Sequence, residues 1–183
     1  MVAIEPSPST RKALAENLAR NDAGNVRVVA AAVGASEGMV PFYRAASNDS
    51  ESSTVQRRRV HLALELESAP LPALLTPDEA ARTALVKIDV EGAEAEALRG
   101  MTRDSAWMPE RLRVVVEVHN QVLAMRGLSI GELIALFADL GFSVAWLPVD
   151  FSERAHLQPD GDATPRTTPL PEDRLFHLIL ART

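Results

Sequence analysis

The hydrophobic pattern of the chain alternates between short β-prone runs and stretches with helical spacing. The first apolar run, Val2–Ile4, ends at Glu5-Pro6, because proline cannot continue a central strand. A helix is expected over about Thr10–Arg20, behind an N-capping Ser9. Apolar or alternating runs predict the other strands. These cover Val26–Val33, Met39–Tyr43, Val60–Leu66, Leu85–Val90, Leu112–Val118, Phe142–Leu147 and Leu175–Leu180.

Two further helices complete the pattern. One follows Glu91-Gly92 and is expected to stop at Gly100, and the other runs from a capping Ser129 to Leu140. Polar or proline-rich stretches predict surface loops over Ala45–Thr54 and Pro148–Asp173. Strands that alternate with helices indicate βαβ units and a mainly parallel sheet. No internal repeat or second domain is visible, so we expect one domain over residues 1–183.

Composition narrows the classes of function. The formal net charge of -6 disfavours a nucleic-acid partner, because phosphate backbones require a basic surface. The absence of cysteine excludes disulfides and thiolate metal ligands. No apolar run approaches the ~18 residues that span a bilayer, and Met1–Pro6 lacks the features of a signal peptide. We therefore expect a cytoplasmic protein without a membrane partner.

Acidic residues follow two of the predicted strands, at the edge where open α/β sheets bind ligands. Glu5 ends the first strand, and a carboxylate there can accept hydrogen bonds from both hydroxyls of a ribose. Asp89 lies at the mouth of a later strand and shares a face with Lys87. Glu91 and Glu94 begin the next helix, where carboxylates either serve a site or only favour the helix dipole.

The strand over Leu112–Val118 ends in a second polar group. Glu117 and His119 are expected to share a face by the period-two alternation of a strand. A histidine titrates near neutral pH and can accept a proton from a hydroxyl. Glu117 could orient His119, pair with a backbone amide or bind substrate. His177 lies inside the last strand and is expected to pack there.

These segments together resemble the FkbM-type methyltransferases. The most distinctive stretch is Leu85–Glu94, which reads LVKIDVEGAE and is followed by Leu98-Arg99-Gly100. The run Val115–His119 is similar to the glutamate-any-histidine strand that comes next in that family. Ala3–Pro8 and Val26–Val33 are similar to its second and third strands. Order and spacing agree over nearly the whole chain.

The resemblance implies a Rossmann-like class I methyltransferase sheet, mostly parallel with an antiparallel C-terminal strand. It also implies S-adenosylmethionine as cofactor and methyl transfer to a small-molecule acceptor, most often a hydroxyl of a sugar or natural product. By position, Glu5 would hold the cofactor ribose, Ala31 and Ala32 would lie near the adenine, and Asp89 would lie by the methionine part or the acceptor. The acceptor side would be lined by Glu91, Glu94, Glu117 and His119, with His119 as the candidate base and Asp89 as the second candidate.

The chain also departs from the family pattern. The family begins with a strand, a glycine-rich loop and a helix, which would precede Val2, so the sheet is expected to be N-terminally incomplete. Strands ending at Glu5 and Asp89 would then present unpaired edges, and each buried unpaired group costs ~1–3 kcal/mol. We expect a fragment or a mis-assigned start. Two alternatives remain: a neighbouring chain of a homo-oligomer could supply the missing strand, or the two strands could pair with each other directly.

Two other functions and a metal site are the alternatives. The missing loop favours a non-catalytic binding module on the same fold. A nucleotide-sugar or dinucleotide enzyme ranks last, because its glycine fingerprint is absent. Asp89, Glu91 and His119 offer oxygen and nitrogen ligands, yet carboxylates have other tasks in methyltransferase sites, and we expect no metal.

Overall fold

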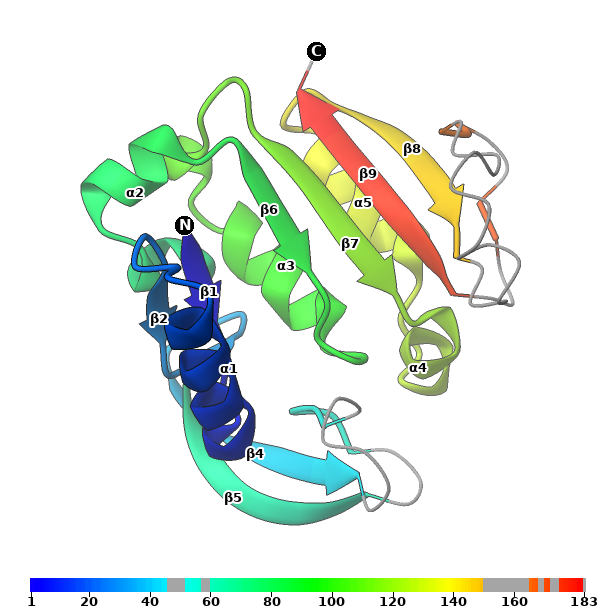
Figure 1. Ribbon diagram of the computed structural model, residues 1–183. Helices are drawn as coiled ribbons and strands as arrows, with labels where there is room; N and C mark the ends of the chain where they lie inside the picture. Colours follow the sequence, from blue (N-terminus) through cyan, green and yellow to red (C-terminus); the bar gives the residue numbers. More distant parts are fainter. Residues whose placement is uncertain (46–51, 57–59, 150–164, 168–169, 172–174, 183) are drawn as a thin grey trace, which may run out of the picture. The chain divides into compact units, whose positions relative to one another are not determined.

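The computed structural model describes the chain apart from residues 46–51, 57–59, 150–164, 168–169, 172–174 and 183. The loops expected over Ala45–Thr54 and Pro148–Asp173 therefore lie largely outside the described residues. Strands and helices follow one another along the chain, and the fold is mixed α/β (Figure 1). The elements in chain order are β1 (Val2–Ile4), α1 (Pro8–Arg20), β2 (Arg27–Val29), β3 (Ala32–Val33), β4 (Gly38–Ala45), β5 (Val60–Ala69), η2 (Leu71–Leu74), α2 (Pro77–Arg82), β6 (Leu85–Ile88), α3 (Glu94–Thr102), η3 (Ser105–Trp107), β7 (Arg113–Val118), α4 (Asn120–Met125), α5 (Ile130–Ala138), β8 (Phe142–Pro148) and β9 (Phe176–Arg182).

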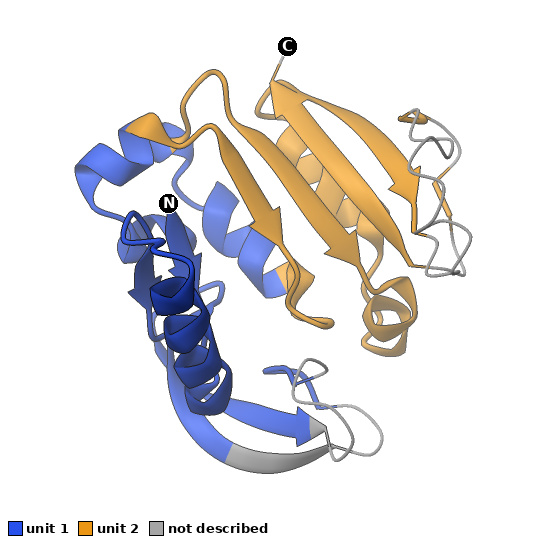
Figure 2. Ribbon diagram, in the orientation of Figure 1, with its two compact units in different colours: residues 1–81, 96–107 blue, residues 82–95, 108–183 orange. Residues whose placement is uncertain are grey.

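The chain divides into two compact units, which Figure 2 colours separately. Unit 1 consists of residues 1–81 and 96–107, and unit 2 consists of residues 82–95 and 108–183. Each unit is thus built from two separate stretches of sequence. That residues 1–183 act as one domain stays a prediction.

In unit 1, helix α1 begins at Pro8, earlier than the sequence suggested. The N-cap is Ser7 rather than Ser9, and its hydroxyl accepts from the amide of Thr10 at 3.4 Å. Pro8 occupies the first turn of the helix, where its missing N–H has no partner to lose and its fixed φ suits the helix. The expected start was wrong because proline ends a strand but can begin a helix.

The β-prone run over Val26–Val33 forms two short strands instead of one. Strand β2 pairs in parallel with β1, and β3 pairs in parallel with β5, so the two halves of the run serve different sheets. Strand β5 also pairs antiparallel with β4, which gives the order β3-β5-β4. A continuous strand was predicted because apolar periodicity does not reveal a change of partner.

Helix α3 continues through Gly100, which was expected to stop it. A Cβ atom at Gly100 would lie 2.0 Å from the backbone oxygen of Gly34, closer than any real contact. Both glycines belong to unit 1. Glycine is therefore needed here because two backbones touch, and not because the helix ends.

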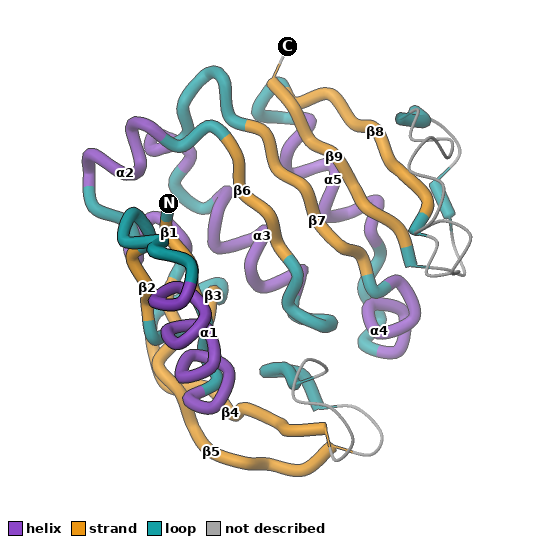
Figure 3. The backbone as a smooth tube through the Cα atoms, in the orientation of Figure 1, coloured by secondary structure: helices purple, strands orange, loops and turns teal. Residues whose placement is uncertain are grey.

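The sheet of unit 2 has the order β6-β7-β9-β8 (Figure 3). Strands β6 and β7 are parallel, with Leu85 opposite Arg113. Strand β9 runs antiparallel to both β7 and β8, which confirms the expected antiparallel C-terminal strand. Within the described residues, β1 pairs only with β2 and β6 pairs only with β7.

One face of this sheet carries the core of unit 2. Alternate residues of β7 and β9 are fully buried, and Leu133 and Phe137 of α5 are buried as well. Figure 1 shows α5 along the sheet behind β7, β9 and β8. Ser129 is the N-cap of α5, as predicted, and it forms a capping box with Glu132, which was not predicted. The buried strand residues are Val114, Val116, Val118, Phe176, Leu178 and Leu180.

Candidate functional site

The polar residues expected to carry chemistry in unit 2 follow the carboxyl ends of β6 and β7. Because these strands are parallel, both ends lie at the same edge of the sheet. Strand β7 leads through His119, which is the N-cap residue of α4, and β6 leads through a tight turn into α3. The hydrophobic pattern did not predict α4, a helix of 6 residues.

His119 lies between two carboxylates. Its Nδ1 atom is 2.8 Å from Oε1 of Glu94, and its Nε2 atom is 3.3 Å from Oε2 of Glu91. The Glu94 side chain has no exposed surface, while that of Glu91 is 21% exposed and that of His119 is 14% exposed. Both ring nitrogens are thus engaged, one by a buried and one by an accessible carboxylate.

The turn between β6 and α3 holds these carboxylates in place. Glu91 and Gly92 both have positive φ, of 54° and 101°. The Gly92 amide donates to Oε1 of Glu94 at 2.9 Å, and the Gly92 carbonyl accepts from Arg126 at 3.0 Å. A Cβ atom at Gly92 would lie 2.5 Å from Cγ1 of Val122. The glycine of this motif therefore serves a left-handed turn packed against α4.

The two carboxylates change the protonation of His119. Burial lowers the pKa of the imidazole, but hydrogen bonds to Glu91 and Glu94, together with their charges, outweigh burial and raise it to about 10. In this arrangement the ring is an imidazolium at neutral pH. It can accept a proton only after it has lost one itself, and loss of a carboxylate contact would favour that neutral form.

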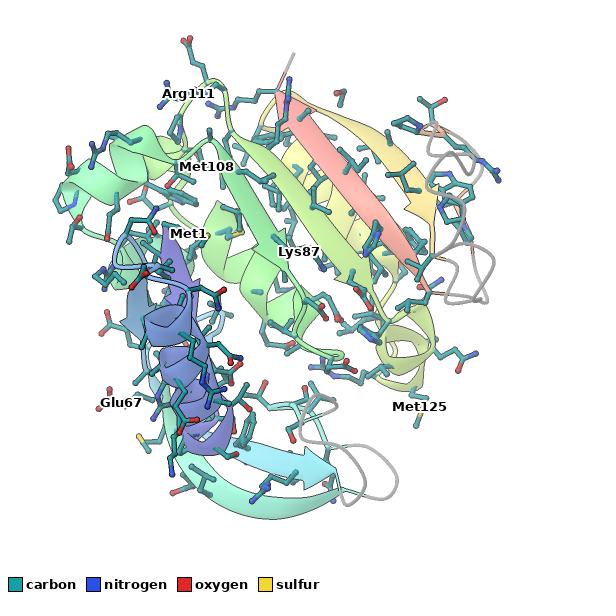
Figure 4. The ribbon with its side chains drawn as sticks, in the orientation of Figure 1. Met1, Glu67, Lys87, Met108, Arg111 and Met125 are labelled. Atoms are coloured by element: carbon teal, nitrogen blue, oxygen red, sulfur yellow. The ribbon has the colours of Figure 1, made fainter. Side chains whose placement is uncertain are left out.

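A second polar cluster lies across β6, β7 and β9. Lys87, labelled in Figure 4, lies 3.4 Å from both Asp89 and Glu117. Glu117 also lies 3.2 Å from Nε2 of His177. The expected partnership of Glu117 with His119 has no counterpart among the described contacts, since the two residues bond to different groups.

His177 was therefore missed as a member of the candidate site. Its side chain is 30% exposed, whereas the sequence suggested packing inside the last strand. The antiparallel pairing of β7 with β9 places His177 directly opposite Glu117. That register depends on a strand partnership that one sequence does not reveal, although a histidine amid alternating apolar residues was an available signal.

The remaining expected residues, Glu5, Ala31 and Ala32, belong to unit 1. Glu5 follows β1, its amide donates to the Val29 carbonyl at 3.0 Å, and its Oε1 accepts from the Ser7 amide at 2.7 Å. Burial raises the pKa of Glu5, and the Ser7 hydrogen bond and the Arg11 charge oppose it. Ala31 and Ala32 are both buried. Glu5 is thus a partly buried carboxylate at the end of a parallel strand.

Other kinds of site find little support in the described part of the chain. No group of three or more histidine, aspartate or glutamate side chains there has an arrangement that could hold a metal ion. None of the helices described is long and apolar enough to cross a membrane.

Comparison with known proteins establishes the family. The model of the methyltransferase FkbM domain matches residues 1–144. The crystal structure of methyltransferase FkbM from Methylobacillus flagellatus KT is similar with a TM-score of 0.54 and 14% sequence identity. The likeness covers 98% of this chain and 36% of that one, so the chain spans about a third of that protein's length. No curated protein matches. The chain belongs to the family of FkbM methyltransferase domains.

Proposed function

We propose that this chain transfers a methyl group from S-adenosylmethionine to a hydroxyl of a small acceptor, such as a sugar or natural product, on a class I methyltransferase sheet. The observation that carries the proposal is the family match over residues 1–144, which includes every candidate residue named above except His177. The gathering of His119 and three carboxylates around the carboxyl ends of β6 and β7 supports it, because this is where open α/β sheets act on ligands.

The residues of unit 1 suit the cofactor. Glu5 would hold the ribose hydroxyls, since a carboxylate accepts from two donors at once, and Ser7 occupies Oε1 with a single hydrogen bond. Ala31 and Ala32 would lie against the adenine. When bound, S-adenosylmethionine supplies a methyl group on a sulfonium centre, which an acceptor oxygen takes up in line while the carbon–sulfur electron pair stays on sulfur.

The residues of unit 2 suit the acceptor. Asp89, whose side chain is 47% exposed, and Glu117 offer acceptor atoms on either side of Lys87. His119 would receive the proton of the reacting hydroxyl at Nε2, which requires that Glu91 has left that atom and that the ring is neutral. Asp89 is the second candidate base, since its carboxylate is accessible and bonded only weakly to Lys87 at 3.4 Å.

Calorimetric titration of S-adenosylmethionine into the purified chain tests the first step. Micromolar binding, weakened by Glu5→Gln and unaffected by the exposed-surface change Glu132→Gln, is the expected result. Absence of binding to a folded chain would contradict the proposal.

An activity test addresses the base. In a preparation that methylates an acceptor, His119→Ala should reduce turnover far more than cofactor affinity. An equal loss of both would argue against the base role. Asp89→Asn, measured beside it, separates the two candidates, because only the true base should shift the pH profile of turnover.

A second function rests on one observation. Both nitrogens of His119 are occupied by carboxylates, which is also what a purely structural histidine would show. The alternative is a non-catalytic module that binds through the same fold. It predicts that His119→Gln lowers stability but leaves ligand binding intact, and that no acceptor is methylated.

A further inference from the structure

Glu94 is the one fully buried acidic residue in the described part of unit 2. It stands at the first position of α3, where a carboxylate would favour the helix dipole even if it were exposed. Burial of a carboxylate is costly unless its oxygens are hydrogen-bonded. The dipole explains the residue type at this position but not its complete burial, so the contacts of the side chain have to explain it.

Those contacts all pass through one oxygen. Oε1 accepts from the Gly92 amide at 2.9 Å and faces Nδ1 of His119 at 2.8 Å. Oε2 is buried and has no hydrogen-bond partner among the described residues. Glu94 therefore joins the turn after β6 to the residue after β7, and its charge is directed at the imidazole ring.

The geometry also fixes which ring atom is accessible. An ionised Glu94 has no proton to donate and can only accept, so Nδ1 carries the hydrogen between His119 and Glu94. Nε2 is left to face Glu91, whose side chain is partly exposed. The charged groups that face or flank the ring are Glu91, Glu94 and, through the Gly92 carbonyl, Arg126.

We propose that Glu94 is a positioning residue, which fixes the His119 ring through Nδ1 so that Nε2 alone is presented to the acceptor, where Glu91 now lies. This inference rests on the proposed function for its catalytic meaning. It differs from the expectation that Glu94 itself lines the acceptor side, for which a side chain without exposed surface offers no contact. Carboxylate–imidazole pairs of this kind set the tautomer of the ring and its orientation.

Nitrogen-15 NMR of the histidine rings tests the proposal on the protein without any ligand. The measurement is made in Glu91→Gln, because loss of that charge lowers the pKa of His119 and makes its neutral form accessible. There the neutral ring should carry its proton on Nδ1. Adding Glu94→Gln should lower the pKa of His119 by a further ~1–3 units and abolish the preference for Nδ1.

Glu117→Gln is the matched control, since it removes the carboxylate that contacts His177 and should leave the titration of His119 in place. A neutral ring protonated on Nε2 in Glu91→Gln, or a pKa that does not respond to Glu94→Gln, would overturn the proposal. If the double variant fails to fold, the tautomer in Glu91→Gln decides alone. The NMR result does not depend on cofactor binding, so it can be interpreted even if the chain proves not to be a methyltransferase.

Discussion

Replacing Gly92 by alanine should destabilise the protein for two separable reasons. The residue has a φ of 101°, where a Cβ atom costs ~1–2 kcal/mol. The same atom would lie 2.5 Å from Cγ1 of Val122, and turning that side chain off its rotamer costs a further ~0.5–1.5 kcal/mol. The sum is roughly 1.5–3.5 kcal/mol. At ~2–4 °C per kcal/mol for a chain of this size, the Tm should fall by roughly 3–14 °C.

Thermal and urea unfolding followed by circular dichroism measure the effect. Gly131→Ala is the matched control, because Gly131 lies in α5 with no close neighbour for its new Cβ, and that change should stabilise by ~0.5–1 kcal/mol. Gly92→Ala in a Val122→Ala background removes the collision and should retain only the backbone cost. A loss below ~0.5 kcal/mol in the single variant would refute both the left-handed turn and its contact with α4.

Three further predictions concern charge and capping. Because the pKa of His119 is raised to about 10, its ion pairs contribute fully below its ordinary pKa of 6.5 and are lost as pH rises through 10. Unfolding midpoints should therefore fall over that range, and His119→Gln should flatten the curve; equal slopes would contradict the shift. The ion pair with Arg27 lowers the pKa of Glu79 to about 2, so its contribution is present above 4.5 and lost as pH falls towards 2. Glu79→Gln should thus lower the midpoint at pH 7 but not at pH 2, and a difference that persists in acid would exclude this origin. Ser129→Ala removes the capping box with Glu132 and should cost ~1 kcal/mol, whereas Ser143→Ala, on the exposed side of β8, should cost less.

The sequence predicted most strands and the family, since both depend on local patterns. Period-two alternation located β5, and continuous apolar runs located β6 and β7. The resemblance of the stretch from Leu85 to Glu94 to the FkbM methyltransferases is confirmed by the family match. These features need no knowledge of what lies across the sheet.

The sequence failed where the outcome depended on a partner distant along the chain. Gly100 has the pattern of a helix stop, but the nearby Gly34 backbone explains it. The bond between Glu117 and His177 follows from the register of β7 with β9. The burial of Glu94 follows from the position of His119 at the start of α4, a helix too short to leave a clear periodicity.

The contact between Gly100 and Gly34 limits how the gene can be divided. The two residues lie in the separate stretches of unit 1, with a segment of unit 2 between them in the sequence. A polypeptide that ends at Ala81 would lack residues 96–107 of unit 1, and with them the fully buried side chains of Leu98 and Met101 in α3. A single cut at a boundary between the units therefore cannot give an expression fragment that contains unit 1 alone and complete.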